Sequence, residues 1–437
     1  MTSFLKGDLR TSNYFKQVGA SFFLKFGAIA ASFLIFPITL SYLGQEVFGV
    51  WSTMLSLVLW MSFCDIGIAN SLRNKIAEHL AKNQPLDADS YISSGQSLIG
   101  IIALILWVFF CAVALIVPWQ SIFNIQSISE VDLRWAVLTL LLFLCINFWL
   151  GTVASVLGAM QQSSLISFGQ LVTNLMTLAM VYILAGAFEP DLVYLCLAYG
   201  ICLVAGNCLL IYCIRKKYQI SWPKFKIKKI HISELSRPGI NFFIIQLAAL
   251  VIFTSDKILI SQLLGPQFIA EYDAVFKLFG VVTLLQGLIL MPLWSAYTDA
   301  YHRQDRVWLS KTLKQQLYFF IALVLFTVVL AFSAKSIIGL WIGPEFEVSD
   351  SLIAWMTIFV LISSWNNIYA VFVNGIGLIR PQCYSAIAGM IANIPLAYLF
   401  VSKLNLGISG VLMASSLSLL FSGIVLPLQV RSIMKRI

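Results

Sequence analysis

The chain has 437 residues, of which 60% are apolar and only 11% are charged, and its mean hydropathy is +0.90. This composition excludes a string of soluble domains of roughly 150 residues each. The formal charge of +9 is compatible with nucleic-acid binding, but the lysines and arginines gather in short segments between apolar runs. That distribution is typical of a membrane protein, so we expect no nucleic-acid partner.

Twelve apolar runs are long enough to cross a hydrocarbon layer of about 30 Å as helices. They fall at residues 17–40, 47–66, 94–117, 135–158, 164–187, 191–214, 240–264, 270–297, 315–334, 350–373, 380–401 and 407–430. Lys25, Pro292 and the Trp365-Asn366-Asn367 sequence interrupt three of the runs, which leaves eleven or thirteen spans as alternatives. The sequence therefore predicts an all-α integral membrane protein of about 12 transmembrane helices. We expect the first run to stay in place as an uncleaved signal-anchor.

Basic residues are dense in every second loop, which indicates the orientation of the chain. If the N-terminus is inside, the external loops keep only Arg134, Lys335 and Lys403. The positive-inside rule then predicts a multi-pass membrane protein with both termini in the cytoplasm. The basic stretch from Arg215 to Lys229 is interpreted as a solvated linker, and contact with anionic lipid heads is the alternative.

The two halves of the chain show weak similarity at an offset of about 220 residues. Gly158 then aligns with Gly377, and Asn174 aligns with Asn393. Each half holds six predicted spans, so the repeats would enter the membrane in the same sense, with a substrate site between them. We therefore predict an N-terminal six-helix bundle at 1–214, a basic cytoplasmic linker at 215–237 and a C-terminal six-helix bundle at 238–437. The two parallel bundles would flank a central cavity.

Charged residues interrupt the seventh and eighth predicted spans. The apolar run Ile240–Leu264 contains Asp256 and Lys257, and the following run contains Lys277. The two runs turn over at Gly265-Pro266, so the three charges are expected at similar depth, in one polar cavity between helices. An ionisable side chain at membrane depth is by default a candidate functional residue.

Each of these charges also has a structural interpretation. Asp256 is able to pair with Lys257 or Lys277 and so hold the two helices together. Lys25 lies only about eight residues into the first span, where a lysine is able to snorkel to the head groups. A ligand role and a structural role therefore both stay open at this point.

A predicted amphipathic helix follows the second span, from Asp65 to Glu78. Leu72 and Ile76 lie on one side of it, and basic residues are available to water or to a ligand. Arg73 is able to grip a phosphate through its planar guanidinium group, but a plain interfacial helix explains the same pattern. Asp65 lies at the membrane boundary, where it either caps this helix or takes part in charge pairing.

Cysteine and tryptophan are interpreted as structural residues. The eight cysteines lie within or beside apolar runs and form no C-x-x-C pair, so we expect no metal and no other cofactor. Five tryptophans are able to stack on sugar faces in a cavity, although an interfacial aromatic belt explains them as well. These are Trp51, Trp60, Trp294, Trp355 and Trp365.

Three motifs resemble those of one transporter family. The run Asp256-Lys257-Ile-Leu-Ile-Ser261, followed by Ala270-x-Tyr272 and Lys277-Leu278, resembles the seventh and eighth helices of bacterial polysaccharide and O-antigen flippases. The segment Asp65-Ile-Gly-Ile-Ala-Asn70-x-Leu-Arg73 is similar to that family's signature after helix two. The sequences Tyr42-Leu43-Gly44 and Phe48-Gly49-Val50-Trp51 are similar to its first external loop. These exporters belong to the multidrug/oligosaccharidyl-lipid/polysaccharide superfamily.

The resemblance implies a MATE-like transporter that flips a polyprenyl-pyrophosphate-linked oligosaccharide, such as an O-antigen repeat unit, by alternating access. It implies that Lys25, Lys257, Lys277 and Arg73 bind the pyrophosphate or an anionic glycan. Asp256 and Asp65 would then serve in charge pairing or in coupling. The expected partners are the lipid-linked oligosaccharide, membrane lipids and a polymerase of the same pathway.

Three other functions compete with flipping. A drug or metabolite antiporter of the same superfamily would more naturally use an acidic cavity. A glycan polymerase or a glycosyltransferase would need a large external loop, and the longest one, at 118–134, is too short for a catalytic domain. A structural membrane protein would leave the intramembrane charges unexplained. We therefore expect a transporter and no catalytic residues.

Overall fold

The computed structural model of the chain describes residues 2–62, 68–81, 84–160, 162–218, 228, 231, 234 and 240–436. These residues form helices and connecting turns, with no strand among them. The helices are α1 (Thr2–Ser62), α2 (Ile68–Ala81), α3 (Pro85–Ile116), α4 (Trp119–Phe123), α5 (Glu130–Leu150), α6 (Thr152–Ala159), α7 (Ser163–Ala187), α8 (Leu192–Tyr218), α10 (Ile240–Leu263), α11 (Ile269–His302), α12 (Arg306–Trp341), α13 (Asp350–Ile376), α14 (Arg380–Tyr398) and α15 (Gly407–Arg436). The 3-10 turn η1 (Pro266–Phe268) precedes α11, and the π-helical turn η2 (Leu399–Lys403) follows α14.

In the described part of the chain, 11 helices are long and apolar enough to cross a membrane. One of them, Gly19–Ser56, covers most of the first predicted span and half of the second, which are two helical stretches of α1 that meet at Gly44. Within hydrocarbon a helix satisfies its own backbone hydrogen bonds, so long apolar runs take this form. The all-α membrane fold expected from the sequence is confirmed.

The chain divides into two units by contact density. The first comprises residues 1–44, 57–121 and 125–238, and the second comprises 45–56, 122–124 and 239–437. The short stretch 45–56 of α1 thus groups with the C-terminal helices. The predicted division at 214 and 238 assigned it to the N-terminal bundle.

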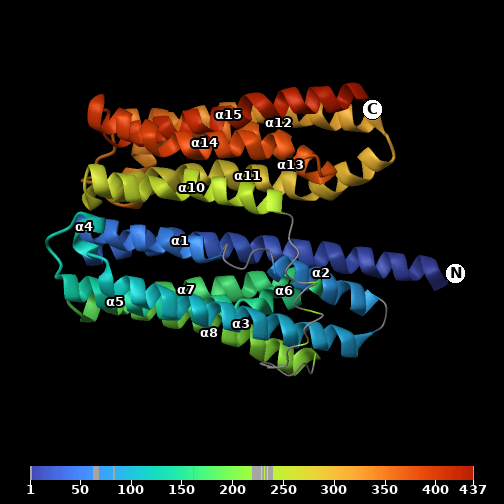
Figure 1. Cartoon of the computed structure of the whole chain (residues 1–437), viewed down its shortest axis with the longest axis horizontal. Helices are drawn as coiled ribbons and strands as arrows, with labels where there is room; N and C mark the ends of the chain where they lie inside the picture. The colour runs from blue at the N-terminus through green and yellow to red at the C-terminus, as the bar shows by residue number, and fades with distance from the viewer. Residues whose placement is uncertain are drawn as a thin grey trace. The chain divides into compact units, whose positions relative to one another are not determined.

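In the first unit, α3, α5, α7 and α8 run side by side (Figure 1). α5 packs against α3 and α8, while α7 packs against α8. The predicted amphipathic helix is present as α2, and it packs on α3 and α6 with Leu72 and Ile76 buried.

In the second unit, α10 to α15 lie along one another (Figure 1). α15 contacts α10, α13 and α14, and α11 contacts α12 and α13. The core is apolar and includes Tyr272, Phe279 and Phe359. This bundle surrounds the charged residues that the sequence singled out in the seventh and eighth spans.

Two glycines of α1 explain how residues 45–56 join the second unit. Gly44 has φ 73°, a conformation that favours glycine, and it kinks the helix. At Gly49 a Cβ atom would lie 1.8 Å from the carbonyl oxygen of Pro266, so only glycine permits this approach. Phe48, Val50 and Trp51 around it are buried.

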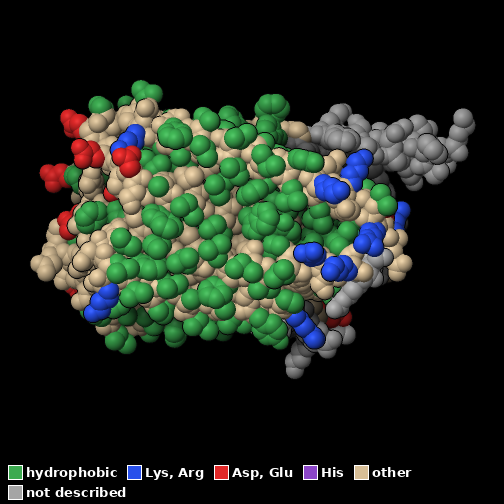
Figure 2. Space-filling view, turned by 90° about the horizontal axis from the view of Figure 1, so that it is seen from above, with side chains coloured by type: hydrophobic (Ala, Val, Ile, Leu, Met, Phe, Trp, Pro, Cys, Tyr) green, Lys and Arg blue, Asp and Glu red, His purple; other side chains and the backbone are tan. Residues whose placement is uncertain are grey.

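Basic and acidic side chains gather at opposite ends of one face of the second unit (Figure 2). Figure 2 shows apolar side chains covering the middle of the face formed by α12 and α15, with most lysines and arginines at one end and most acids at the other. An apolar belt between charged ends is what a membrane-spanning bundle requires.

Candidate functional site

The charged residues of α10 and α11 lie close to the turn that joins these helices. α10 ends at Leu263, and α11 begins at Ile269 after Gly265 and η1. Lys257 lies six residues before the end of α10, which corresponds to about 9 Å at 1.5 Å per residue. These residues belong to apolar spans, so their charges need partners.

Lys257 forms an ion pair with Asp273 of α11. Its Nζ atom lies 2.8 Å from Asp273 Oδ1, and the two side chains are only 20% and 11% exposed. The same ammonium group donates a 2.8 Å hydrogen bond to the Ser52 hydroxyl of α1. Ser52 in turn donates to Asp273 Oδ2. The three side chains close a ring, which fixes the position of the Lys257 ammonium.

Lys277 belongs to the same cluster. It lies four residues after Asp273 on α11, which places both on one face of the helix. It is half-buried and within electrostatic range of both Asp273 and Lys257. Two lysines around one aspartate give the Lys257–Asp273–Lys277 cluster a net positive charge.

Asp256 takes part in a different set of contacts. Its side chain is fully buried. The Tyr272 hydroxyl donates to Oδ2 at 2.9 Å, and the Ser415 hydroxyl donates to Oδ1 at 2.7 Å. The carboxylate therefore joins α10, α11 and α15 through neutral hydroxyl groups.

The contacts of Asp256 extend into a buried polar network. Asn393 of α14 donates from Nδ2 to the Ser415 hydroxyl at 3.0 Å. Its Oδ1 accepts from the Ser255 hydroxyl at 3.1 Å. Asn393 and Ser415 have no exposed surface. Asp256 is thus the one ionisable carboxylate among Ser255, Tyr272, Asn393 and Ser415.

Two expectations about Asp256 need correction. It does not share a polar cavity with Lys257, because neighbouring residues on a helix point about 100° apart and here reach different partners. The structural alternative, in which Asp256 pairs with a lysine, is also wrong, since both of its carboxylate oxygens accept from hydroxyl groups. Lys257 and Lys277 do come together, as expected.

The sequence analysis overlooked Asp273 and Ser52. Asp273 stands four residues before Lys277 within the same apolar span, a spacing typical of an intrahelical charge partner. That signal was available in the sequence. Ser52 carried no comparable signal, because its contact depends on the close approach of α1 at Gly49.

The other candidate residues lie in the first unit. Lys25 is exposed on α1, and so are the neighbouring Phe22, Phe23 and Phe26. Arg73 is exposed on α2 and runs past Gly158, where a Cβ atom would lie 3.1 Å from its Nε atom. Asp65 lies outside the described residues, so its predicted role is still a prediction.

The described residues of the basic linker contact α2 and α3. Glu234 accepts a 2.5 Å hydrogen bond from the Tyr91 hydroxyl and lies 3.3 Å from the Lys75 ammonium. His231 stacks on the Tyr91 ring with centroids 3.9 Å apart. The Tyr91 hydroxyl and Lys75 lower the pKa of Glu234, and burial lowers the pKa of His231. We call these four residues the linker anchor.

Other candidate chemistry receives little support. Within the described ranges, no three His, Cys, Asp or Glu side chains are grouped so that they could hold a metal ion. Trp51 is buried, whereas Trp294 is 42% exposed. Trp365 donates a 3.0 Å hydrogen bond to the carbonyl of Gly423. A sugar-stacking role for the tryptophans stays a prediction.

The chain is similar to one protein family, to two O-antigen transport proteins and to a solved transporter structure. The family described as "Polysaccharide biosynthesis protein" matches residues 15–298. A Salmonella typhimurium protein named "Putative O-antigen transporter" is 25% identical over 87% of both chains. A Yersinia pseudotuberculosis "Putative O-antigen export protein" is 23% identical over 88% of both. A solved inward-facing MATE family multidrug transporter matches with a TM-score of 0.75 and 16% identity, over 93% of this chain and 95% of that one.

The fold is that of a multi-pass helical membrane protein and is similar to that of MATE family transporters. The chain belongs to the polysaccharide biosynthesis protein family. The family resemblance seen in the motifs around Asp256, Gly49 and Arg73 is thereby confirmed.

Proposed function

We propose that the chain is a flippase for a polyprenyl-pyrophosphate-linked oligosaccharide, such as an O-antigen repeat unit. It moves this lipid from the cytoplasmic to the periplasmic leaflet of the bacterial inner membrane by alternating access, with both termini in the cytoplasm. The observation that carries the proposal is the net positive Lys257–Asp273–Lys277 cluster inside two adjacent apolar spans. Family membership and relatives named for O-antigen transport support the choice of substrate.

A cationic cluster meets the main physical difficulty of this reaction. A pyrophosphate carries about two negative charges, and bare charge is strongly disfavoured in hydrocarbon. Lysine ammonium groups held by the protein replace part of the lost hydration, while the lipid tail stays in the bilayer. Asp273 and Ser52 hold Lys257 in one position, so little conformational entropy is lost when an anion binds. Lys25 and Arg73, both exposed, are kept as further candidate contacts for the pyrophosphate or for an anionic glycan.

Asp256 is assigned the coupling role. It is fully buried, its partners are neutral hydroxyls, and it joins three helices of the second unit. A change in its charge, by uptake of a proton or a small cation, would alter the contacts of α10, α11 and α15 together. Such a change is a physical means of linking an ion gradient to movement of the helices.

O-antigen display by lysine variants tests whether the chain is a flippase or a drug antiporter of the same superfamily. Lys257→Ala and Lys277→Ala are expressed singly in a strain lacking its own flippase, and O-antigen or capsule display is measured. Lys335→Ala and Lys403→Ala are controls that each remove an exposed lysine outside the cluster. Strong loss of display in the first pair alone, with equal membrane expression, supports flipping. Normal display from both Lys257→Ala and Lys277→Ala would overturn it.

A further inference from the structure

A basic groove runs along the first turns of α12, away from the residues assigned to flipping. Its volume is about 570 Å³, and Arg306, Ser310, Lys311, Lys314, Gln315 and Tyr318 line it. All of these side chains except Ser310 are exposed. The groove therefore offers three cations, a hydroxyl, an amide and a phenol within about three helical turns.

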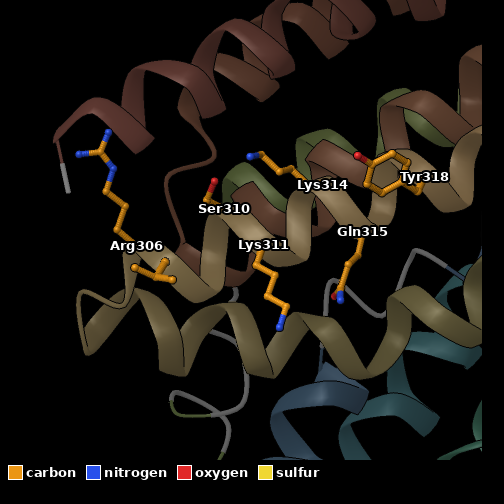
Figure 3. Close-up of a pocket in the computed structure, with 7 residues that line it drawn as sticks. Arg306, Ser310, Lys311, Lys314, Gln315 and Tyr318 are labelled. Carbon is orange, nitrogen blue, oxygen red and sulfur yellow. The ribbon is translucent and has the colours of Figure 1, made fainter.

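The groove side chains form two rows. Figure 3 shows Ser310 and Lys314 extending to one side of the α12 axis and Lys311 and Gln315 extending to the other. Polar groups therefore stand on both sides of an open strip of helix. A compact anion placed over the strip is within reach of donors from both rows.

Among the described residues, no acidic side chain lines the groove. The nearest one in sequence, Asp305, accepts a 2.9 Å hydrogen bond from the backbone N–H of Trp308 and so caps the start of α12. In the part of the chain that the structure describes, the lining of the groove thus sets no carboxylate beside its three cations. A ligand with negative charge supplies what the groove lacks.

The same face of α12 turns apolar directly after Tyr318. Ile321, Leu325, Val329 and Phe332 follow at intervals of three or four residues and are 56%, 64%, 64% and 88% exposed. Lys311, Lys314 and Tyr318 precede them at the same intervals, so all seven residues lie along one side of the helix. From Ile321 to Phe332 the apolar part of this strip is roughly 17 Å long at 1.5 Å per residue, about half the thickness of a hydrocarbon layer and so the depth of one leaflet.

We propose that this face of α12 is a binding site for an anionic phospholipid. The head group lies in the groove against Lys311, Lys314 and Arg306, and one acyl chain follows the strip from Ile321 to Phe332. The phenol of Tyr318 marks the boundary between the two parts, as tyrosine does at membrane interfaces. A zwitterionic lipid is disfavoured, because its own ammonium group would meet three cations. This site is independent of the proposed flipping reaction.

Lipid retention by the purified full-length protein tests the assignment. The protein is exposed to an equimolar mixture of phosphatidylglycerol and phosphatidylcholine in detergent, and the bound lipids are counted by native mass spectrometry. We expect preferential retention of phosphatidylglycerol. Lys311→Gln with Lys314→Gln should weaken it about 25-fold, since each lysine near a lipid phosphate contributes roughly fivefold.

A matched variant, Arg431→Gln with Lys435→Gln, removes two exposed cations from the last turns of α15, outside the groove. It should retain phosphatidylglycerol as the wild type does. Equal retention of both lipids, or equal loss in the two double variants, would overturn the proposal. So would full displacement of phosphatidylglycerol by an equimolar polyprenyl pyrophosphate, which would assign the groove to that lipid instead. Unchanged folding of each variant is checked by its elution from a sizing column.

Discussion

Lys257 and Asp273 come from helices joined by a short turn and meet in a 2.8 Å ion pair within apolar spans. Ser52, more than 200 residues away in the sequence, bonds to both. The pair places one lysine firmly beside Lys277 and keeps the excess charge of the cluster small. A buried charge held in this way is available to a ligand without a large cost of reorganisation.

The ion pair should show strong energetic coupling. We expect Lys257→Gln and Asp273→Asn each to destabilise the protein, because each leaves its partner with a charge in an apolar span. The double variant should cost less than the sum of the two by about 1–3 kcal/mol. Reversible unfolding in SDS measures the three free energies of unfolding.

An exposed pair provides the control for this cycle. Lys335 and Asp350 are also 2.8 Å apart, but their side chains are 51% and 85% exposed. The cycle of Lys335→Gln and Asp350→Asn should give a coupling below about 1 kcal/mol. Similar coupling in both cycles would contradict the view that burial makes the Lys257–Asp273 pair special.

Replacement of Asp256 should separate folding from transport. Asp256→Asn keeps the shape and an oxygen for the Tyr272 hydroxyl, so the protein should fold and reach the membrane. Transport should fall strongly, because the side chain is no longer able to change its charge. Display of O-antigen, together with membrane expression, measures the two effects.

Two companion variants sharpen that test. Asp256→Ala removes the acceptor of two buried hydroxyls and should destabilise the protein by about 1–3 kcal/mol for each group left unsatisfied. Ser415→Ala should lower stability less, since the Asp256 carboxylate keeps its Tyr272 partner. Full transport by Asp256→Asn would exclude the coupling role.

The close approach of α1 to the Gly265-Pro266 turn predicts a steric effect. Gly49→Ala should fold poorly, because the added Cβ atom would lie 1.8 Å from the Pro266 carbonyl oxygen. Relief of this clash requires a backbone shift, which costs free energy of folding. Gly280→Ala is a suitable control, since a Cβ atom there meets nothing within 4 Å in the helix α11. The yield of monodisperse protein in detergent compares the two. Equal yields would contradict this account of Gly49.

Acid should release the linker anchor. The lowered pKa of Glu234 means that its contribution is present above the ordinary glutamate pKa and is lost as pH falls. The lowered pKa of His231 acts in the same direction, because protonation near its buried position is disfavoured. Lys75, whose pKa is raised by its Glu234 partner, loses charge only in strongly alkaline solution. The anchor should therefore hold at pH 8, begin to loosen below about pH 6.5 as protonation of His231 becomes favourable in the released linker, and lose the Glu234 contacts only below about pH 4.5.

Hydrogen exchange measures this release. Amides of a peptide covering 226–236 should exchange faster at pH 5 than at pH 8, and faster again at pH 3.5, after correction for the intrinsic rates, while a reference peptide from α13 should not change. Glu234→Gln, which keeps an acceptor for Tyr91, should weaken protection at pH 8. Protection that is independent of pH would show that these groups do not hold the linker.

Local rules explain why much of this fold was predictable. Apolar runs of about 20 residues indicate spans, and α2 appears where Leu72 and Ile76 mark a helical face. Gly49 and Asp256 appeared in the recognised motifs, and each occupies a constrained position in the structure. The two helical stretches of α1 that meet at Gly44 correspond to the first and second predicted spans, because Gly44 takes a non-helical conformation that interrupts the helix.

The partners of the buried charges were harder to predict. Asp256 and Lys257 are adjacent in sequence, so depth alone suggested one cavity for both. Their directions around α10 separate them, and the choice of partner depends on Ser52 and Ser415, which belong to distant segments. Long-range contacts of this kind leave no pattern in a single sequence.

Binding of the lipid-linked pyrophosphate to the purified protein tests the central proposal most directly. A polyprenyl-pyrophosphate-linked oligosaccharide is titrated against the wild type, against Lys257→Gln with Lys277→Gln, and against Lys335→Gln with Lys403→Gln. We predict that the first double variant binds at least about tenfold more weakly, a change of 1.4 kcal/mol, and that the second binds as the wild type does. Equal affinity of all three proteins would contradict a cationic site for the pyrophosphate at Lys257 and Lys277.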